Sequence, residues 1–227
     1  MKKRSIVAES RTPAHPAAPA DVPRTRRPLA GATFVIAAAA PSQLSPQGPA
    51  EVAFAGRSNA GKSSAINALA RQTRLAFASR TPGRTQQIVF FALAKGGGLV
   101  ADLPGYGYAA VAKEVKRGWQ DFLWSYLTTR STLVGLVIVV DARRGLGTLD
   151  CAVLDGFLPS GRPVLILATK SDKLNVAQRR DAVDAIRGAV AQRYPGAVNA
   201  VTILPFSATA RTGVEEADTV LDTWLPS

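Results

Sequence analysis

The segment GRSNAGKSS, from Gly56 to Ser64, constrains the fold of this chain more than any other stretch of its sequence. It fits the pattern G-x-x-x-x-G-K-S, directly after the apolar run VAFA (52–55) and before a helix-forming segment (62–70). Glycines let the backbone curl until successive N–H groups point at phosphate oxygens, and the following helix adds its positive N-terminal end. The segment therefore predicts a strand, a phosphate-binding loop and a helix. A glycine turn without a ligand is the alternative.

The side chains of this loop suggest individual roles. Lys62 is placed to reach the β- and γ-phosphates of a nucleotide, and the Ser63 hydroxyl is placed to ligate Mg²⁺. The candidate phosphate-binding residues are Gly56, Arg57, Ser58, Asn59, Ala60, Gly61, Lys62, Ser63 and Ser64.

The segment DLPG follows about forty residues later, at the end of the apolar run 99–102. Asp102 can hold Mg²⁺ through a water molecule, and the Gly105 amide can meet a γ-phosphate. Alone the pattern D-x-x-G is weak evidence for a nucleotide site, but it becomes stronger evidence when it follows a phosphate-binding loop. The candidate residues are Asp102, Leu103, Pro104 and Gly105.

Between these two segments lies SRTPGRTQQ (79–87). A threonine in such a loop can place its hydroxyl on Mg²⁺ and its amide on the γ-phosphate, which orders the loop only while that phosphate is present. Thr81 and Thr85 are both candidates, and the spacing from the following strand favours Thr85, with Gly83 and Arg84 beside it. The catalytic candidates of the chain are Lys62, Thr85 and Gly105.

The segment ATKSD, with Thr169, Lys170 and Asp172, predicts which base is bound. A carboxylate can accept two hydrogen bonds at once from guanine, from its ring N1–H and its exocyclic amine, whereas adenine offers no such pair of donors. The lysine stem can lie along the base. The segment FSA follows the last strand, with Phe206, Ser207 and the Ala208 amide, which could bond the guanine oxygen. These segments together predict GTP and GDP as ligands.

Strands and helices alternate along the chain. We expect strands at 52–55, 87–94, 99–102, 133–140, 163–169 and 201–205, and helices at 62–70, 113–130, 148–158, 176–194 and 214–225. The runs LVGLVIVV and PVLILAT are continuously apolar, as in central strands buried on both faces. The fold class is therefore α/β, with a mostly parallel central sheet, one antiparallel hairpin and helices on both faces. Residues 1–28, rich in proline, alanine and arginine, are expected to form a disordered basic tail, and 29–227 the domain.

Composition bounds the partners. The net charge of +12, from 28 Lys+Arg against 16 Asp+Glu, suggests a polyanionic partner, nucleic acid or an anionic membrane, with a solvated basic surface as the alternative. One cysteine and one histidine leave no room for an intrachain disulfide or a zinc cluster. No apolar run reaches the roughly 18 residues of a membrane span. The cysteine usage and the lack of a span indicate a cytoplasmic protein. We also expect a monomer without a membrane partner.

The motifs together resemble the TrmE-Era-EngA-YihA-septin-like P-loop GTPases. The stretches EVAFAGRSNAGKSS, SRTPGRTQ, DLPGYGYA, TKSDKL and FSATARTGVEEA are similar to those of the EngB (YihA, YsxC) family of bacterial ribosome-assembly GTPases, over residues 34–225. The resemblance implies a Ras-like fold and a GTP-dependent role in maturing the large ribosomal subunit, with ribosomal RNA or subunit precursors as partners, and a link to cell division and septation.

Two positions qualify the expected activity. Many GTPases follow D-x-x-G with a glutamine that orients the attacking water, but here Tyr106 stands in its place, with packing of a loop as the other reading of this tyrosine. We therefore expect slow hydrolysis. In GTPases with a similar loop an asparagine can help to hold K⁺ near the phosphates, and Asn59 is the candidate, with a loop hydrogen bond as the alternative.

Two other functions stay open at this point. A nucleotide-independent RNA-binding module would use the phosphate loop only structurally. A P-loop kinase acting on a small molecule would need an acceptor pocket and would not need Thr169, Lys170 and Asp172. No acidic residue lies between Val52 and Ala101, and Arg80 and Arg84 flank the loop that should order with GTP. This arrangement favours RNA contact that depends on the nucleotide.

Overall fold

The structure, a computed structural model, describes residues 26–45, 47–77, 87–95, 97–106 and 113–225, of which 113–120 are described by their backbone alone. Strands (β), α-helices (α) and short 3-10 helices (η) alternate along it. The elements are β1 (Thr33–Ala38), η1 (Pro41–Gln43), β2 (Glu51–Gly56), α1 (Lys62–Ala70), β3 (Ile88–Ala92), β4 (Leu99–Asp102), α2 (Lys113–Thr129), β5 (Leu133–Asp141), α3 (Thr148–Phe157), η2 (Leu158–Ser160), β6 (Val164–Thr169), η3 (Ser171–Lys173), α4 (Val176–Arg193), η4 (Pro195–Ala200), β7 (Val201–Pro205) and α5 (Val214–Trp224).

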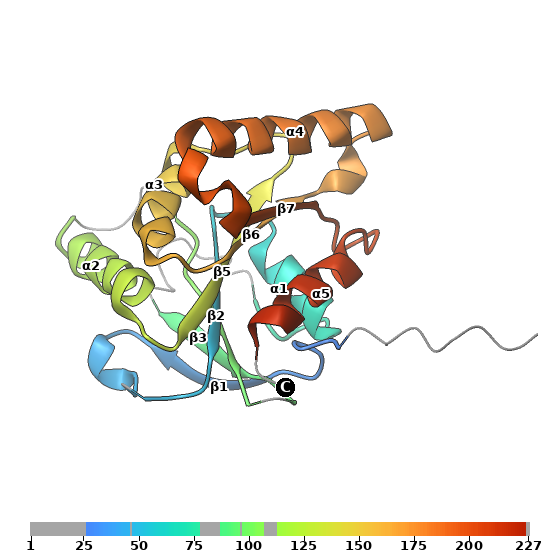
Figure 1. Cartoon of the computed structure of the whole chain (residues 1–227). Helices are drawn as coiled ribbons and strands as arrows, with labels where there is room; N and C mark the ends of the chain where they lie inside the picture. The colour runs from blue at the N-terminus through green and yellow to red at the C-terminus, as the bar shows by residue number, and fades with distance from the viewer. Residues whose placement is uncertain (1–25, 46, 78–86, 96, 107–112, 226–227) are drawn as a thin grey trace, which may run out of the picture.

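A seven-stranded sheet lies at the centre of the molecule, in the order β1-β3-β4-β2-β5-β6-β7 (Figure 1). Strand β3 runs antiparallel to both of its neighbours, β1 and β4, and the other neighbouring strands are parallel. The predicted fold class, a mostly parallel sheet with one antiparallel hairpin, is confirmed. Strand β1 extends the sheet beyond that hairpin, where it pairs Thr33 with Ala92 and Ala38 with Ile88.

The central strands are buried because they are covered on both faces. Every residue of β2 and β6 is buried, as is nearly all of β5. Parallel strands covered by helices on both sides contain continuous apolar runs, which is the pattern that the sequence shows there. The predicted strands at 52–55, 133–140 and 163–169 are therefore confirmed to within one residue at each end.

The helices form a layer on each face of the sheet (Figure 1). Helices α1 and α5 cover one face, where Ile66 and Leu221 are fully buried against Phe54. Helices α2, α3 and α4 cover the other face, where Leu127, Phe157 and Ile186 are almost fully buried. The predicted helices on both faces are confirmed.

Four parallel strands end at the same edge of the sheet. The register pairs Gly56 of β2 with Val139 of β5, Phe54 of β2 with Asp102 of β4, and Asp141 of β5 with Thr169 of β6. In open α/β sheets ligands bind outside the carboxyl ends of the strands. The sheet thus brings the ends of β2, β4 and β6, which carry three of the sequence motifs, to one place.

A buried charged network lies at the opposite end of β2. Glu51 is fully buried, and its carboxylate accepts hydrogen bonds from Tyr126 Oη at 2.8 Å, Thr132 Oγ1 at 2.9 Å and Arg130 Nε at 3.1 Å. Burial and the Glu51 charge raise the pKa of the Tyr126 hydroxyl well above its ordinary value, so this hydroxyl stays a donor. The network joins the start of β2 to the end of α2 and the start of β5.

The described chain begins against helix α5. Arg26 Nε lies 3.1 Å from Asp222 Oδ1, and the Leu29 side chain is fully buried. The predicted tail falls almost entirely on residues 1–25, outside the described residues, so its disorder stays a prediction. Among the described helices none combines the length and the apolar character that crossing a bilayer requires.

Candidate nucleotide-binding site

The loop predicted to bind phosphates connects β2 to α1, and two of its glycines are needed for different reasons. A Cβ at Gly56 would come within 2.7 Å of the Val139 carbonyl oxygen, so only glycine fits beside β5. Gly61 has φ +102°, a backbone conformation that residues with a side chain rarely adopt. Gly61 precedes the first helical residue, Lys62, and its carbonyl accepts from Ala65 N at 2.9 Å. The predicted strand, loop and helix are confirmed.

Lys62 and Asp102 meet across this loop. The Lys62 ammonium group forms an ion pair with Asp102 Oδ1, although the two residues are 40 positions apart. Burial raises the pKa of the Asp102 carboxyl above its ordinary value, and the charge of Lys62 partly offsets that effect. Two residues that the sequence assigned to the phosphates and the metal therefore lie side by side.

The segment predicted to read the base also contacts the phosphate loop. The Thr169 hydroxyl hydrogen-bonds the Ala60 carbonyl and lies 3.0 Å from the Val140 carbonyl. Lys170 Nζ donates to the Asn59 carbonyl at 2.7 Å. Both bonds span more than a hundred residues of sequence. The segment predicted to read the base and the loop predicted to bind phosphates are therefore held together.

Asp172 is oriented by the last strand. Ser207 Oγ donates to Asp172 Oδ1 at 2.7 Å and accepts from Ala210 N at 3.0 Å. The Ser207 hydrogen bond is the main reason that the pKa of the Asp172 carboxyl lies below its ordinary value, so the group is an anion at neutral pH. Phe206 is fully buried, and its backbone nitrogen donates to the Ala168 carbonyl at 2.8 Å. The structure brings the ATKSD and FSA segments together.

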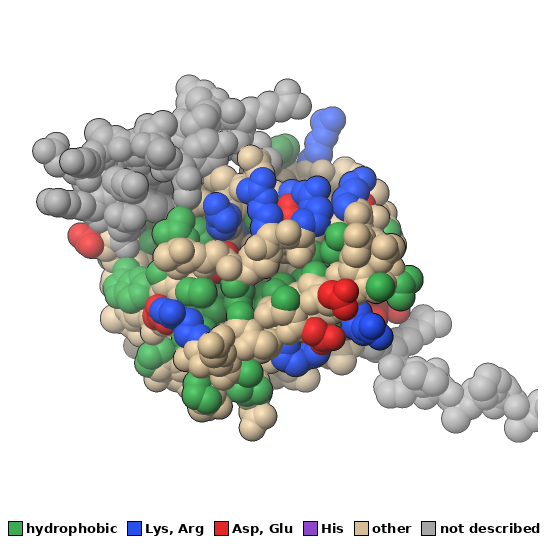
Figure 2. Space-filling model, turned by 90° about the horizontal axis from the view of Figure 1, so that it is seen from above, with side chains coloured by type: hydrophobic (Ala, Val, Ile, Leu, Met, Phe, Trp, Pro, Cys, Tyr) green, Lys and Arg blue, Asp and Glu red, His purple; other side chains and the backbone are tan. Residues whose placement is uncertain are grey.

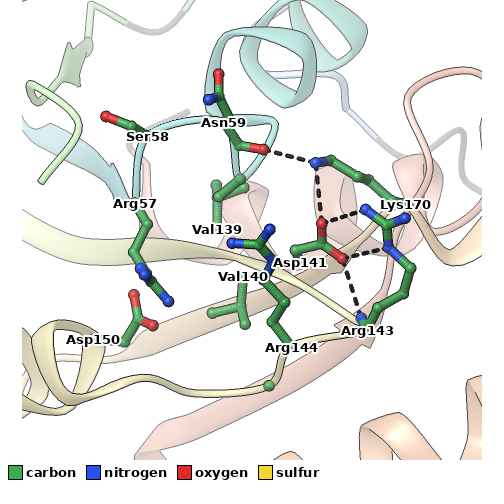
Figure 3. A pocket seen from close by; sticks show the side chains of 12 residues that line it. Arg57, Ser58, Asn59, Val139, Val140, Asp141, Arg143, Arg144, Asp150 and Lys170 are labelled. Carbon is green, nitrogen blue, oxygen red and sulfur yellow. Dashed lines mark hydrogen bonds and ion pairs between the residues drawn. The ribbon is translucent and has the colours of Figure 1, made fainter. Parts of the chain in front are cut away.

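Asp141 is a site residue that the sequence reasoning missed. Its carboxylate accepts from Arg143 Nε at 3.0 Å and Nη2 at 2.7 Å, and lies 3.0 Å from Lys170 Nζ (Figure 3). These cations, Arg143 foremost, hold the pKa of the carboxyl well below its usual range. Asp141 thereby orients Lys170. The sequence feature that could have predicted it is its position directly after the apolar run 133–140, which places it at the same edge of the sheet as Thr169.

Tyr106, the residue after Gly105, is held by two elements. Its hydroxyl donates to Asp150 Oδ1 at 2.6 Å, and Asp150 Oδ2 accepts from Gly147 N at 2.8 Å at the start of α3. Its backbone pairs with the phosphate loop, because Ser58 N donates to the Tyr106 carbonyl at 3.1 Å. Burial, with the charge of Asp150, raises the pKa of this hydroxyl strongly. The Tyr106 side chain thus points toward α3. Neither Asp150 nor Asp141 was predicted from the sequence as a residue of the site.

The remaining predicted site residues divide into two groups. Ser63 and Ser64 lie in the first turn of α1, and Leu103, Pro104 and Gly105 directly follow β4. A Cβ at Gly105 would come within 3.1 Å of Ser58 Oγ, so this segment packs tightly on the phosphate loop. The predictions for Gly83, Arg84, Thr85 and the alternative Thr81 lie outside the described residues, as do Arg80 and Tyr108.

Comparison with known proteins gives a consistent result. The family model described as "50S ribosome-binding GTPase" matches residues 51–170. The "Probable GTP-binding protein EngB" of Azoarcus sp. (strain BH72) is 50% identical over 194 residues, which cover 86% of this chain and 91% of that protein. The protein of the same name from Bordetella pertussis (strain Tohama I) is 48% identical over 200 residues, 86% of this chain and 94% of that protein.

Solved structures show the same fold. The crystal structure of a probable GTP-binding protein engB superposes with a TM-score of 0.59 at 22% identity, over 76% of this chain and 97% of that chain. A single-residue variant of Aquifex aeolicus Era bound to GDP.AlF4- superposes with a TM-score of 0.62 at 20% identity, over 80% of this chain and 58% of that chain. At these identities the likeness concerns the fold.

Proposed function

Because this chain belongs to the EngB family of GTP-binding proteins, which are P-loop GTPases, we propose that it is a slow GTP-dependent switch in the assembly of the large ribosomal subunit. In this role it binds subunit precursors or their RNA while GTP is present and leaves them after hydrolysis. Its action supports normal growth and cell division, including septation.

One observation carries the proposal: the base-reading and phosphate-binding segments are in contact. Lys170 Nζ lies 2.7 Å from the Asn59 carbonyl, and the Thr169 hydroxyl bonds the Ala60 carbonyl. A protein that reads guanine and holds a triphosphate needs both segments within the length of one nucleotide. A small-molecule kinase has no use for the guanine-reading carboxylate of Asp172.

The phosphates and a metal ion would be held at the phosphate loop. Backbone amides of residues 56–64 would surround the phosphates and Lys62 would contact the β- and γ-phosphates. The oxygen donors of Ser63 and Thr85, with Asp102 acting through water, suit Mg²⁺, which keeps several waters and binds phosphate oxygens. The described residues contain no cluster of three or more His, Cys, Asp or Glu side chains that could hold a metal unaided. When bound, Mg²⁺ would neutralise charge on the phosphate oxygens.

The position of Tyr106 supports the proposal of slow hydrolysis. Its hydroxyl is 2.6 Å from Asp150 Oδ1, so it is engaged at the start of α3 and not available to orient a water molecule. Lys62, Thr85 and the Gly105 amide would then stabilise the transition state largely by charge and hydrogen bonding to the γ-phosphate. A protein of this kind suits a switch better than a fast catalyst.

The partner, compartment and oligomeric state belong to the same proposal. A net charge of +12 favours a polyanion, and the name of the matching family model points to the 50S ribosome. We propose that the protein works as a monomer in the cytoplasm, where precursor subunits and GTP are available.

Sedimentation with ribosomal particles tests the switch. We expect the protein to pellet with large-subunit precursors when loaded with a non-hydrolysable GTP analogue, and to stay in the supernatant with GDP, because only the γ-phosphate can engage Thr85 and Gly105. Particles of the small subunit serve as the control. Equal sedimentation with the GTP analogue, with GDP and without nucleotide would contradict a switch and favour a nucleotide-independent RNA-binding module.

The monovalent cation provides a second test. If Asn59 holds K⁺ beside the phosphates, hydrolysis should be faster in KCl than in NaCl of equal ionic strength, because K⁺ adds positive charge near the transition state. Asn59→Ala should remove the difference. Asn67→Ala should keep it, because Asn67 lies in α1 and its side chain accepts from the Leu75 and Ala76 amides that follow this helix. Equal rates of wild type in both salts would leave Asn59 a structural residue of the loop.

A further inference from the structure

A cavity of about 130 Å³ lies between the phosphate loop and the loop that joins β5 to α3 (Figure 3). Its walls include Arg57 and Asn59 from the phosphate loop, and Lys170 after β6. Asp141 at the end of β5, Arg144 in the loop after it and Asp150 in α3 also line it. Since a water molecule occupies about 30 Å³ in the liquid, the cavity has room for about four waters or a small anion.

The two acidic groups of the cavity are already engaged. Asp141 accepts from Arg143 and pairs with Lys170, and Asp150 accepts from the Tyr106 hydroxyl and the Gly147 amide. The two carboxylates therefore have few acceptor positions left for the other cationic side chains of the walls, Arg57 and Arg144.

Among the cationic side chains that the structure describes in these walls, those of Arg57 and Arg144 make no hydrogen bond or ion pair with another lining residue. Figure 3 draws no hydrogen bond or ion pair from either guanidinium group to the other residues shown. Arg57 Nη1 is close to the backbone of Gly147, where a Cβ would come within 3.2 Å of it, so this guanidinium is held beside the start of α3. Guanidinium groups present planar pairs of N–H donors that match the oxygens of a phosphate.

We propose that this cavity binds a backbone phosphate of ribosomal RNA, held by Arg144 and Arg57. The inference rests on the proposed function, because it takes RNA as the partner, and it adds the place of contact. Guanidinium donors match a carboxylate as well as a phosphate, so RNA is preferred to an acidic protein because of the proposed function and the net charge of +12. The surroundings agree: no acidic residue occurs between Val52 and Ala101, and Lys and Arg side chains gather on the face seen from above (Figure 2).

The cavity adjoins the proposed nucleotide site. In Figure 1 the chain passes from the upper end of β2 into α1, so the phosphate loop lies on the face that Figure 2 views. Residues 57–60 form a wall of the cavity and are also part of the loop proposed to hold the nucleotide. An RNA phosphate in the cavity therefore touches the nucleotide site directly, without an intervening element.

The test compares Arg144→Ala with Arg144→Lys and Arg180→Ala in the full-length protein loaded with a GTP analogue. Arg144 is not among the residues proposed to bind nucleotide, and Arg180 is an exposed arginine of α4 outside the cavity. Binding of a fluorescein-labelled RNA hairpin and of purified large subunits is measured by anisotropy and sedimentation, from about 0.05 to 0.2 M KCl. Nucleotide affinity is measured in parallel.

We expect Arg144→Ala to weaken binding of both probes about fivefold to tenfold, as for loss of a hydrogen bond to a charged group at a partly exposed site. The plot of log K against log salt should become shallower by about 0.7 to 0.9, the contribution of one phosphate contact. Arg144→Lys should keep the wild-type slope, because it keeps the charge. Arg180→Ala should behave as wild type, and every variant should bind GTP as wild type does.

Several results would overturn the inference while the proposed function stands. One is that Arg144→Ala binds RNA as tightly as wild type does. Another is that Arg144→Ala and Arg180→Ala lose RNA affinity to the same extent. A third is that Arg144→Ala loses nucleotide binding, which would make the cavity part of the nucleotide site. Weaker binding to large subunits with unchanged binding to the hairpin would assign the cavity to an acidic protein surface. If wild type binds neither probe, the proposed function fails together with this inference.

Discussion

Asp172→Asn is expected to lower the affinity for GTP and GDP at least tenfold and to raise the affinity for XTP. The carboxylate is proposed to accept two hydrogen bonds from guanine, and each hydrogen bond to a charged group contributes about 1.5–3 kcal/mol. Ser207 Oγ, 2.7 Å from Asp172 Oδ1 in the wild type, can still donate to the amide oxygen of asparagine. The new amide nitrogen would then face the base, where it suits the 2-oxo group of xanthine.

Fluorescent GDP and XDP analogues, titrated by equilibrium fluorescence, measure this change. Asp181→Asn is the matched control, since it makes the same chemical change on the exposed side of α4 and should leave both affinities as they are. Unchanged binding of GTP by Asp172→Asn would remove Asp172 from the proposed guanine site, whatever else the chain does with nucleotides.

Glu51→Ala is expected to lower the free energy of unfolding by about 3–5 kcal/mol, the usual effect of removing one partner of a buried ion pair. The substitution leaves the buried Tyr126 hydroxyl without its acceptor. The Arg130 side chain, of which 12% is exposed, keeps its hydrogen bond to the Ser45 carbonyl but loses the opposite charge. The free energy of unfolding of a folded domain is about 5–15 kcal/mol, so the variant should lose a large share of its stability. Nucleotide affinity of the folded fraction should not change, because Glu51 lies at the opposite end of β2 from the phosphate loop.

Urea unfolding followed by tryptophan fluorescence measures the difference. The control is Arg187→Ala, which removes an ion pair to Asp184 whose side chains are both more than half exposed, and which should hardly shift the urea midpoint. Should Glu51→Ala unfold at the same urea concentration as Arg187→Ala, the buried network would not stabilise the start of the sheet.

The elements that the sequence predicted well are those with a local signal. The run LVGLVIVV became β5 because a strand covered by helices on both faces must be apolar throughout. Helix α1 begins at Lys62, as predicted, because Gly61 takes a left-handed conformation and ends the loop there. The candidate phosphate loop and the ATKSD segment could be singled out for the same reason: the chemistry predicted for them requires a fixed spacing.

The features that escaped prediction depend on contacts between distant residues. Glu51 and Arg130 are 79 positions apart, and nothing near either residue indicates the other. Tyr106 could be read as a missing glutamine or as loop packing, and only the fold brings Asp150, 44 positions away, to its hydroxyl. Asp141 lies at the end of an apolar strand, where nothing in the local sequence indicates a partner. Its pairing with Lys170 depends on the register of β5 with β6.

The bonds from Thr169 and Lys170 to the carbonyls of Ala60 and Asn59 have a thermodynamic consequence. They fix a loop backbone from outside, so its conformational entropy is lost when the chain folds and not when a nucleotide binds. A loop ordered in advance lets the nucleotide's own contacts contribute more fully to affinity. If these segments hold the base and the first phosphates, as proposed, that part of the site is ordered before the nucleotide binds.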